Sequence, residues 1–239
     1  MEISSGIEII DLALYLKKEK ILIIADTHIG YEEALNKQGM LVPRFQFKEI
    51  IKRLEKIFSA AGEVNSVVIN GDVKHEFGVI SEQEWRETLK LIDFLIEKGK
   101  KVILIKGTHD KILGPIAGKR GIEVREGVKI NSIFITHGDR IPATPDFSDS
   151  KTVIIAHDHS AISLKEGARH ELYKCFLKGK WKDKELIVMP SFNLVTEGTD
   201  ILREELLSPF LKTANLRNFE VFIVSDKVYE FGKVRGLGK

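Results

Sequence analysis

The sequence predicts an α/β protein of one domain over residues 1–239, in which two mixed sheets pack on each other and helices lie outside them. Three observations predict this fold class. Five short apolar runs rich in β-branched residues each end in a polar cluster, which is typical of central strands. Segments with helical periodicity separate the first three runs, as in a parallel sheet. The second half is richer in strand patterns and contains two predicted hairpins.

The apolar runs predict strands that are buried on both faces, because their apolar residues are continuous instead of alternating with polar ones. They are residues 21–24, 67–69, 102–105, 133–135 and 153–155.

Two segments between the first three strands predict amphipathic helices. Residues 46–61 and 81–98 both repeat apolar side chains at helical spacing. The second segment opens with Ser81 and Glu84, which have the spacing of a capping box. Gly99 follows it where a helix commonly ends in a glycine.

The last third of the chain predicts two hairpins and a connecting segment. The paired runs are 170–176 with 186–189, and 219–224 with 227–231. The polar residues 178–184 predict a solvated turn in the first hairpin, and Ser225-Asp226 a tight connection in the second. Residues 199–217 predict a short helix or a loop, with Thr199 or Asp200 as N-cap and a break at Pro209.

Composition excludes several classes of protein. A hydrophobic content of 43% with 30% charged residues excludes a disordered chain. The single cysteine, Cys175, excludes a disulfide framework and a Cys-built zinc site, and is predicted to be a small buried hydrophobe. The net charge of +2 gives no argument for a nucleic-acid or membrane partner. Without a long apolar run or a signal-peptide pattern, we expect a cytoplasmic protein with no membrane association.

Histidine and aspartate gather at the ends of the predicted strands. The histidines at or near these ends are His28, His75, His109, His137, His157 and His159. Ligands collect at the carboxyl ends of strands in open α/β sheets, so this distribution predicts one built site. Any single histidine could instead be a core residue with a satisfied ring.

The spacing of these residues suits a metal site. In Asp26-Thr27-His28 the first and third side chains point to the same side of an extended backbone, and His157-Asp158-His159 repeats this arrangement. Gly71 allows a sharp turn before Asp72. Imidazole and carboxylate together favour Mn, Fe, Zn, Co or Ni over Ca or Mg. Without a thiolate, the set predicts an open, catalytic site.

These blocks resemble the motifs of the calcineurin-like metallophosphoesterases. The matching order is D-x-H, G-D-x-x-H, G-x-H-D, H-G and x-H-x-H over residues 26–159. Gly71-Asp72-Val73-Lys74-His75 is similar to the branch that contains the SbcD-type DNA repair nucleases, and the segments AHDHSAISL and MPSFN resemble a small archaeal phosphoesterase group related to it. The resemblance implies a four-layer α/β/β/α sandwich with two mixed sheets.

The resemblance also implies roles for individual residues. A first metal would bind Asp26, His28 and His159, and Asp72 would bridge both metals. The second would bind His137 and His157, with Thr108 where the family usually has an asparagine ligand. The threonine side chain is shorter than that of asparagine, and its neutral hydroxyl is a weaker metal ligand than an amide oxygen. We therefore expect the second site to bind its metal more weakly than the first.

The implied activity is hydrolysis of a phosphodiester by a hydroxide that bridges two divalent transition metals, with Mn²⁺ expected and Fe, Zn, Ni or Co as alternatives. His109 would be the general acid, and Asp110 beside it would orient the ring or raise its basicity. The substrate would be a phosphodiester, with nucleic acids and nucleotides among the possibilities. A phosphomonoesterase or protein phosphatase, and a non-catalytic scaffold of this fold, remain alternatives; His75 argues against the first and the intact His109 against the second.

Three other residues near these blocks have two interpretations each. His75 is either a neighbour of the site or a helix-start histidine held by a backbone carbonyl. Lys74 is expected to be solvated, with a phosphate contact as the alternative, and Asn193 lines the site or stabilises a turn.

Overall fold

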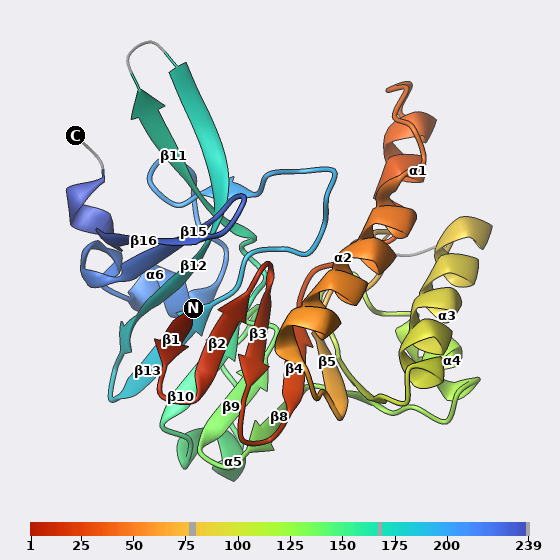
Figure 1. Cartoon of the computed structure of the whole chain (residues 1–239), viewed down its shortest axis with the longest axis horizontal. Coiled ribbons are helices and arrows are strands. Elements are labelled where there is room, and N and C mark those ends of the chain that lie inside the picture. The colour runs from red at the N-terminus through yellow and green to blue at the C-terminus, as the bar shows by residue number, and fades with distance from the viewer. Residues whose placement is uncertain (77–79, 167–168, 238–239) are drawn as a thin grey trace. The chain divides into compact units, whose positions relative to one another are not determined.

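The computed structural model describes residues 1–76, 80–166 and 169–237 (Figure 1). The chain divides into two compact units. Unit 1 comprises Met1–Glu126 with Phe192–Thr196, and unit 2 comprises Gly127–Ser191 with Glu197–Lys239. Each unit contains its own mixed sheet, which confirms the predicted α/β class with two mixed sheets. That the whole chain is one domain stays a prediction.

The described part of unit 1 contains a seven-stranded sheet in the order β1 to β7. Its strands are β1 (Glu2–Ser4), β2 (Ile7–Ile10), β3 (Ala13–Leu16), β4 (Ile21–Ile24), β5 (Ser66–Asn70), β6 (Lys101–Ile105) and β7 (Val124–Arg125). The predicted strands β4, β5 and β6 pair in parallel. The antiparallel strands β1 to β3 are not predicted from the sequence, and the chain turns between them at Gly6 and Asp11 with positive φ angles.

The helices of unit 1 are α1 (Tyr31–Lys37), α2 (Gln46–Ala61), α3 (Glu82–Glu97) and α4 (Leu113–Gly118). The two predicted helices, α2 and α3, are confirmed, and α2 has the predicted bounds. The capping box is present, because the Ser81 hydroxyl accepts from the Glu84 N–H (3.1 Å) and the Glu84 carboxylate accepts from the Ser81 N–H (2.8 Å). Gly99 ends α3 with φ 71° and donates its N–H to the Ile96 carbonyl (2.8 Å).

The described part of unit 2 contains a nine-stranded sheet. Its strands are β8 (Gly127–Ile130), β9 (Ile133–Thr136), β10 (Thr152–Ile155), β11 (Ser160–Glu166), β12 (Arg169–Trp181), β13 (Lys184–Val188), β14 (Thr199–Asp200), β15 (Glu220–Val224) and β16 (Val228–Lys233). The parallel trio β9, β10 and β13 lies at its centre, and β11 to β13 and β15 to β16 form antiparallel pairs. Two short helices, α5 (Pro145–Ser148) and α6 (Pro209–Thr213), complete the unit together with 3₁₀ turns at Leu216–Asn218 and Val234–Gly236.

The first predicted hairpin is present, but the prediction of a solvated turn over 178–184 is wrong. Strand β12 continues to Trp181, and only two residues separate it from β13. Trp181 is 3% exposed and donates its indole N–H to the Thr213 hydroxyl (2.8 Å). Lys184 is 6% exposed because its ammonium donates to the carbonyls of Ser148 (2.7 Å) and Ser150 (2.6 Å). A lysine with backbone acceptors can be buried, which a charge run does not reveal.

The connecting segment also differs from the prediction. Pro209 begins α6 instead of breaking the segment, because proline suits the first helical position, where its missing N–H is not needed. Thr199 and Asp200 form β14 beside β11. The second hairpin, β15 with β16, is confirmed.

The core of unit 2 contains the single cysteine. Cys175 is fully buried among the side chains of Ile162, Leu177 and Ile223, among others. Burial raises the pKa of its thiol, so the group stays protonated and behaves as the small hydrophobe predicted.

The helices of the described residues are too short or too polar to cross a lipid bilayer.

Candidate functional site

Two turns of unit 1 hold three of the predicted metal ligands. Strand β4 leads into Asp26-Thr27-His28, and β5 leads into Gly71-Asp72. Backbone hydrogen bonds join these turns, from the Asp26 N–H to the Gly71 carbonyl (3.1 Å) and from the His28 N–H to the Asp72 carbonyl (3.0 Å). All three side chains are buried, and their candidate ligand atoms lie within 4.8 Å of one another.

The backbone is left-handed at five of the seven predicted ligands, a conformation that L-residues adopt at a cost of about 1–2 kcal/mol each. The φ angles are 51° at Asp26, 43° at His28, 43° at Asp72, 72° at His157 and 49° at His159. Positive φ at non-glycine residues is uncommon and clusters at functional sites, where the surrounding fold maintains it. The expectation that Asp26–His28 and His157–His159 lie on an extended backbone is therefore wrong, because the first and third residues of each segment have a left-handed backbone.

The loop after β6 holds the Asp72 carboxylate. The His109 N–H donates to Asp72 Oδ1 (2.8 Å), and the Thr108 hydroxyl lies 3.2 Å from Oδ2. A Cβ on Gly107 would lie 2.1 Å from Asp72 Oδ1, so this close approach requires glycine. The predicted ligand Thr108 therefore lies against the carboxylate that is predicted to bridge the metals.

Asp110 joins the loops that follow β5 and β6. Its buried carboxylate accepts from the backbone N–H groups of Val73 (3.1 Å) and Gly107 (3.0 Å). Each of these donors lies next to a residue of the site, Asp72 or Thr108. This carboxylate therefore positions the backbone of both loops, a contribution that sequence analysis missed. Its predicted effect on the His109 ring stays a prediction.

The ring of His109 has a defined tautomer. Its Nδ1 is hydrogen-bonded to the backbone carbonyl of His75. A carbonyl oxygen can only accept, so Nδ1 carries the proton, and Nε2 is the nitrogen available for proton transfer. Nε2 lies 3.9 Å from Asp72 Oδ2. The sequence-predicted acid is thus oriented by backbone and faces the carboxylate of Asp72.

His75 lies beside His28 and His109, and their three rings form a cluster. Its ring centroid is 5.4 Å from that of His28 and 4.1 Å from that of Tyr31. Burial, reinforced by His109, lowers the pKa of His75 to about 4, so its ring is neutral at neutral pH. Of the two interpretations, the structure favours the neighbour of the site.

Glu84 supports the segment that carries His75, which sequence analysis also missed. Besides capping α3, its buried carboxylate accepts from the N–H groups of His75 (3.1 Å) and Glu76 (2.7 Å). The capping-box pattern predicts only the Ser81 partner, because it is local in sequence. Gly30 packs against Glu84 so closely that a Cβ there would lie 2.2 Å from Glu84 Cγ.

The prediction of a solvated Lys74 is wrong. Its side chain is fully buried, and its ammonium donates to the carbonyl of Glu76. Lysine carries four methylene groups that pack well, and a backbone acceptor offsets part of the cost of burying its charge.

Asn193 belongs to unit 1, stabilises the turn that it begins, and contacts Asp26 through its backbone. Its N–H donates to the Asp26 carbonyl (3.0 Å), and its side-chain oxygen accepts from the Val195 N–H (2.7 Å). The turn interpretation is therefore confirmed, and this turn lies at a predicted ligand.

Unit 2 carries the other predicted ligands at the ends of two neighbouring parallel strands. His137 follows β9, and His157 follows β10. His157 Nδ1 lies 3.0 Å from His137 Nε2, close enough for a hydrogen bond or for two lone pairs directed at one cation. His159 follows on the same turn, and a Cβ on Gly198 would lie 2.2 Å from its carbonyl oxygen.

Asp158, between two of these histidines, has a structural role. Its buried carboxylate accepts from the N–H groups of Leu207 (2.5 Å) and Ser208 (3.0 Å). The Ser208 hydroxyl donates to the Gly138 carbonyl (2.7 Å). These bonds tie the turn at His157 to the segment before α6 and to the residue after His137.

The donor set fits divalent transition metals. Asp26 and Asp72 are two buried carboxylates with oxygen atoms within 4.8 Å of each other, an arrangement that is costly without a cation. Imidazole nitrogens accompany them in unit 1, and a close imidazole pair is present in unit 2. This nitrogen and oxygen chemistry is typical of catalytic metal centres.

One of the solved structures that align with this chain has the same fold. The chain is similar to the nuclease MPE of Pseudomonas putida, with 20% identity, a TM-score of 0.65 and 92% of each chain covered. It also aligns with Yfce, a phosphoesterase from E. coli, at 14% identity and a TM-score of 0.44, covering 90% of this chain and 97% of that one. Vacuolar Protein Sorting 29 from Cryptosporidium parvum aligns at 18% identity and a TM-score of 0.36, covering 89% and 97%. No curated protein sequence gives a significant match.

The family comparison agrees with the motifs and with the fold. The model of the calcineurin-like phosphoesterase family matches residues 19–216. This range includes all the predicted metal ligands together with His109 and Asp110. Because the match covers most of the chain, the protein belongs to the calcineurin-like phosphoesterase family.

Proposed function

We propose that the protein is a dinuclear-metal-dependent phosphoesterase that hydrolyses phosphodiester bonds. The observation that carries the proposal is the buried set of Asp26, His28 and Asp72, held in left-handed backbone with the His109 N–H on the Asp72 carboxylate. Residues of this kind, kept in a costly conformation, indicate a site maintained for chemistry and not for stability.

The proposed ligands follow the family motifs. By those motifs Asp26, His28 and His159 would bind one metal, Asp72 would bind both, and His137, His157 and Thr108 would bind the other. Bound divalent cations of this type polarise phosphoryl oxygens and lower the pKa of a water nucleophile. We expect Mn²⁺ to be the most effective ion, with Fe, Zn, Ni and Co as alternatives.

The proposed role of His109 is to protonate the leaving oxygen. Its Nδ1–H donates a hydrogen bond to the His75 carbonyl. The proton that His109 transfers is therefore the one on Nε2. Nε2 lies 3.9 Å from Asp72 Oδ2, so the donating nitrogen faces the proposed metal ligand. Asp110 would help by holding the backbone of this loop.

Two observations favour a diester over a monoester. His75 ends the block Gly71-Asp72-Val73-Lys74-His75, which is similar to the branch that contains the SbcD-type DNA repair nucleases, and its ring lies beside His28 and His109. The fold neighbour from Pseudomonas putida is a nuclease, and nucleases cleave phosphodiesters. A nucleic acid or nucleotide is therefore the substrate class that we propose.

Metal removal tests the proposed function. Protein treated with a chelator should lose hydrolysis of bis-p-nitrophenyl phosphate, and adding Mn²⁺ should restore it, because the metals supply the charge that the reaction requires. Parallel assays with p-nitrophenyl phosphate and with the other transition ions serve as controls. Activity that survives stripping would contradict a metal enzyme. Faster monoester hydrolysis would indicate a phosphomonoesterase, and inactivity with every ion would indicate a scaffold.

Replacing Thr108 tests the second metal site. Calorimetric titration of the wild type with Mn²⁺ should give one tight and one weaker ion, because a threonine hydroxyl is a poorer ligand than an amide oxygen. Thr108→Asn should tighten the weaker site roughly ten-fold, the effect of one added neutral ligand. Thr108→Ser retains the hydroxyl near Asp72 and should match the wild type. Two equally tight sites in the wild type, or no gain in the asparagine variant, would refute this assignment.

A further inference from the structure

The loop between α1 and α2 in unit 1 exposes a cluster of apolar side chains. Met40 is 48% exposed, Leu41 95% and Phe45 40%. These three large hydrophobic residues lie within six positions of each other. Exposed apolar residues scattered singly are common, but such a cluster marks an interaction surface. We call residues 38–45 the apolar loop.

The apolar loop has a defined conformation. The Asn36 side chain donates to the carbonyls of Glu32 (2.7 Å) and Val42 (2.8 Å) and accepts from the Val42 N–H (3.3 Å). The buried Glu32 carboxylate accepts from the N–H groups of Phe45 (2.6 Å) and Gln46 (2.7 Å). Because side chains of α1 hold both halves of the loop, its apolar residues are presented to solvent in a fixed arrangement.

Hydrogen bonding also connects the apolar loop to the proposed metal site. Gln46, the residue after the loop, is buried and donates its side-chain amide to the Thr27 carbonyl (2.8 Å). Thr27 lies between the proposed ligands Asp26 and His28. The loop and the ligand turn are therefore parts of one hydrogen-bonded structure within unit 1.

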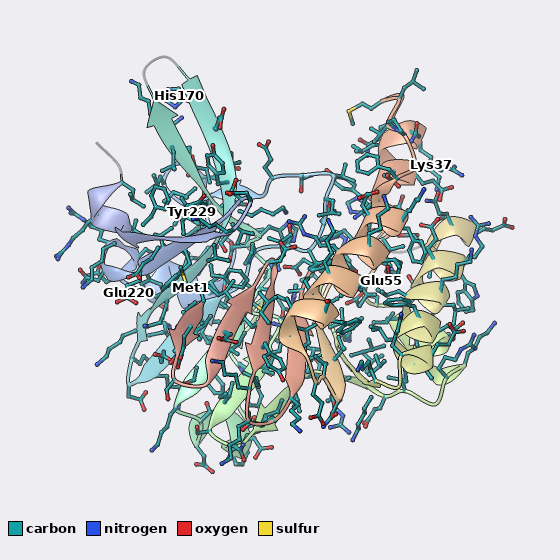
Figure 2. The ribbon with its side chains drawn as sticks, in the orientation of Figure 1. Met1, Lys37, Glu55, His170, Glu220 and Tyr229 are labelled. Carbon is teal, nitrogen blue, oxygen red and sulfur yellow. The ribbon has the colours of Figure 1, made fainter. Side chains whose placement is uncertain are left out.

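The charge of this segment favours an anionic partner. The apolar loop itself contains one cationic residue, Arg44, and no carboxylate, while Lys37 and Lys48 lie on either side of it and Lys37 Nζ is 3.9 Å from Glu33 Oε1. Figure 2 labels Lys37 on α1, the helix that leads into the apolar loop. All three cationic residues are exposed. Two copies of this chain joined loop to loop would oppose like charges, which disfavours self-association through this surface.

We propose that the apolar loop binds nucleic acid with unpaired bases, which deepens the proposed phosphodiesterase function and rests on it. Lys37, Arg44 and Lys48 would contact phosphates, while Leu41, Met40 and Phe45 would contact base faces. Leucine, methionine and phenylalanine are side chains that proteins insert against unstacked bases. The connection from Gln46 to Thr27 favours a nucleic acid over a lipid surface, because it joins this surface to residues proposed to act on phosphodiesters.

A binding experiment with the full chain loaded with Mn²⁺ tests this inference. The variants are Met40→Ser with Leu41→Ser, which removes the apolar contacts, and Arg44→Gln, which removes one charge. Leu207→Ser, at a 61% exposed leucine of unit 2, is the matched control. Fluorescence anisotropy measures affinity for a single-stranded oligonucleotide and for a blunt duplex of the same length, both with phosphorothioate linkages that resist hydrolysis. Thermal unfolding confirms that each variant is folded.

The serine pair should weaken single-strand binding about ten-fold and duplex binding much less, because it removes base contacts. Arg44→Gln should weaken both and reduce the salt dependence of binding. Leu207→Ser should bind as the wild type does, and all three variants should hydrolyse bis-p-nitrophenyl phosphate at the wild-type rate.

Unchanged single-strand binding in the serine pair would overturn the inference, as would an equal loss in Leu207→Ser. The serine pair could instead bind phosphatidylserine vesicles more weakly than the wild type while it binds DNA equally well. That result would assign the loop to a lipid surface and would also overturn the inference. Failure of the wild type to hydrolyse any phosphodiester would instead refute the proposed function, even where the serine pair binds DNA weakly.

Discussion

Replacing His109 with alanine is expected to lower kcat by about 10²–10⁴-fold, the usual effect of losing a general acid, while the content of bound Mn²⁺ stays unchanged. The metal should remain because the contact of residue 109 with Asp72 uses the backbone N–H, which alanine retains. The fall in kcat should be smallest for substrates that release p-nitrophenolate, a good leaving group. It should be larger for substrates that release an alkoxide, which needs a proton. Turnover and metal analysis by mass spectrometry measure both effects.

His170→Ala is the matched control, because His170 is an exposed histidine of unit 2 and should tolerate the change without loss of activity. An alanine variant at position 109 that loses its metal would assign His109 to the ligands. A loss of rate that is equal for good and poor leaving groups would remove it from proton transfer.

Replacing Asp72 with asparagine should abolish both metal binding and turnover, since Asp72 is the ligand that we propose for both ions. The metal-free variant should unfold at the same temperature as the metal-free wild type or at a higher one. The reason is that the substitution removes one of two buried carboxylates with oxygen atoms within 4.8 Å of each other. Thermal unfolding with and without Mn²⁺ measures the effect: the rise in Tm that Mn²⁺ produces in the wild type should disappear.

Asp183→Asn, at an exposed position in the β12–β13 turn, should keep the wild-type response to Mn²⁺. An Asp72→Asn variant with full metal content would contradict the assignment of Asp72. A metal-free variant that unfolds well below the metal-free wild type would show that Asp72 serves stability instead.

The elements predicted correctly are those whose signals are local in sequence. Strand β4 is a continuous apolar run, and α2 repeats its apolar residues at helical spacing over its whole length, so each pattern contains the information that defines the element. The capping box at Ser81 and the glycine at position 99 define the ends of α3 through interactions within a few residues.

The elements missed depend on contacts with distant residues. Lys184 is buried because its ammonium reaches carbonyls of Ser148 and Ser150, more than thirty residues away, and no charge pattern reveals such acceptors. Lys74 is also buried, although its acceptor, the Glu76 carbonyl, lies only two residues further along the chain. The N-terminal strands β1 to β3 are three or four residues long, which is too short for a period to be recognised.

For the candidate site, the sequence predicts the proposed ligands better than the carboxylates that hold the surrounding loops in place. Asp26, His28 and Asp72 follow β4 and β5, which pair in parallel, so their proximity could be expected from topology. The carboxylates of Asp110, Asp158 and Glu84, which bind backbone N–H groups of neighbouring loops, could not. Their acceptor roles depend on which loops lie beside them in the folded chain.

The left-handed backbone at the proposed ligands has a consequence for selection. Asparagine and glycine tolerate this conformation better than histidine does. A library selected only for abundant folded protein should therefore accumulate glycine and asparagine at positions 28, 157 and 159. A library selected for hydrolysis should keep histidine there. Comparing the two populations would separate the positions that the fold requires from those that the chemistry requires, without measuring any single variant.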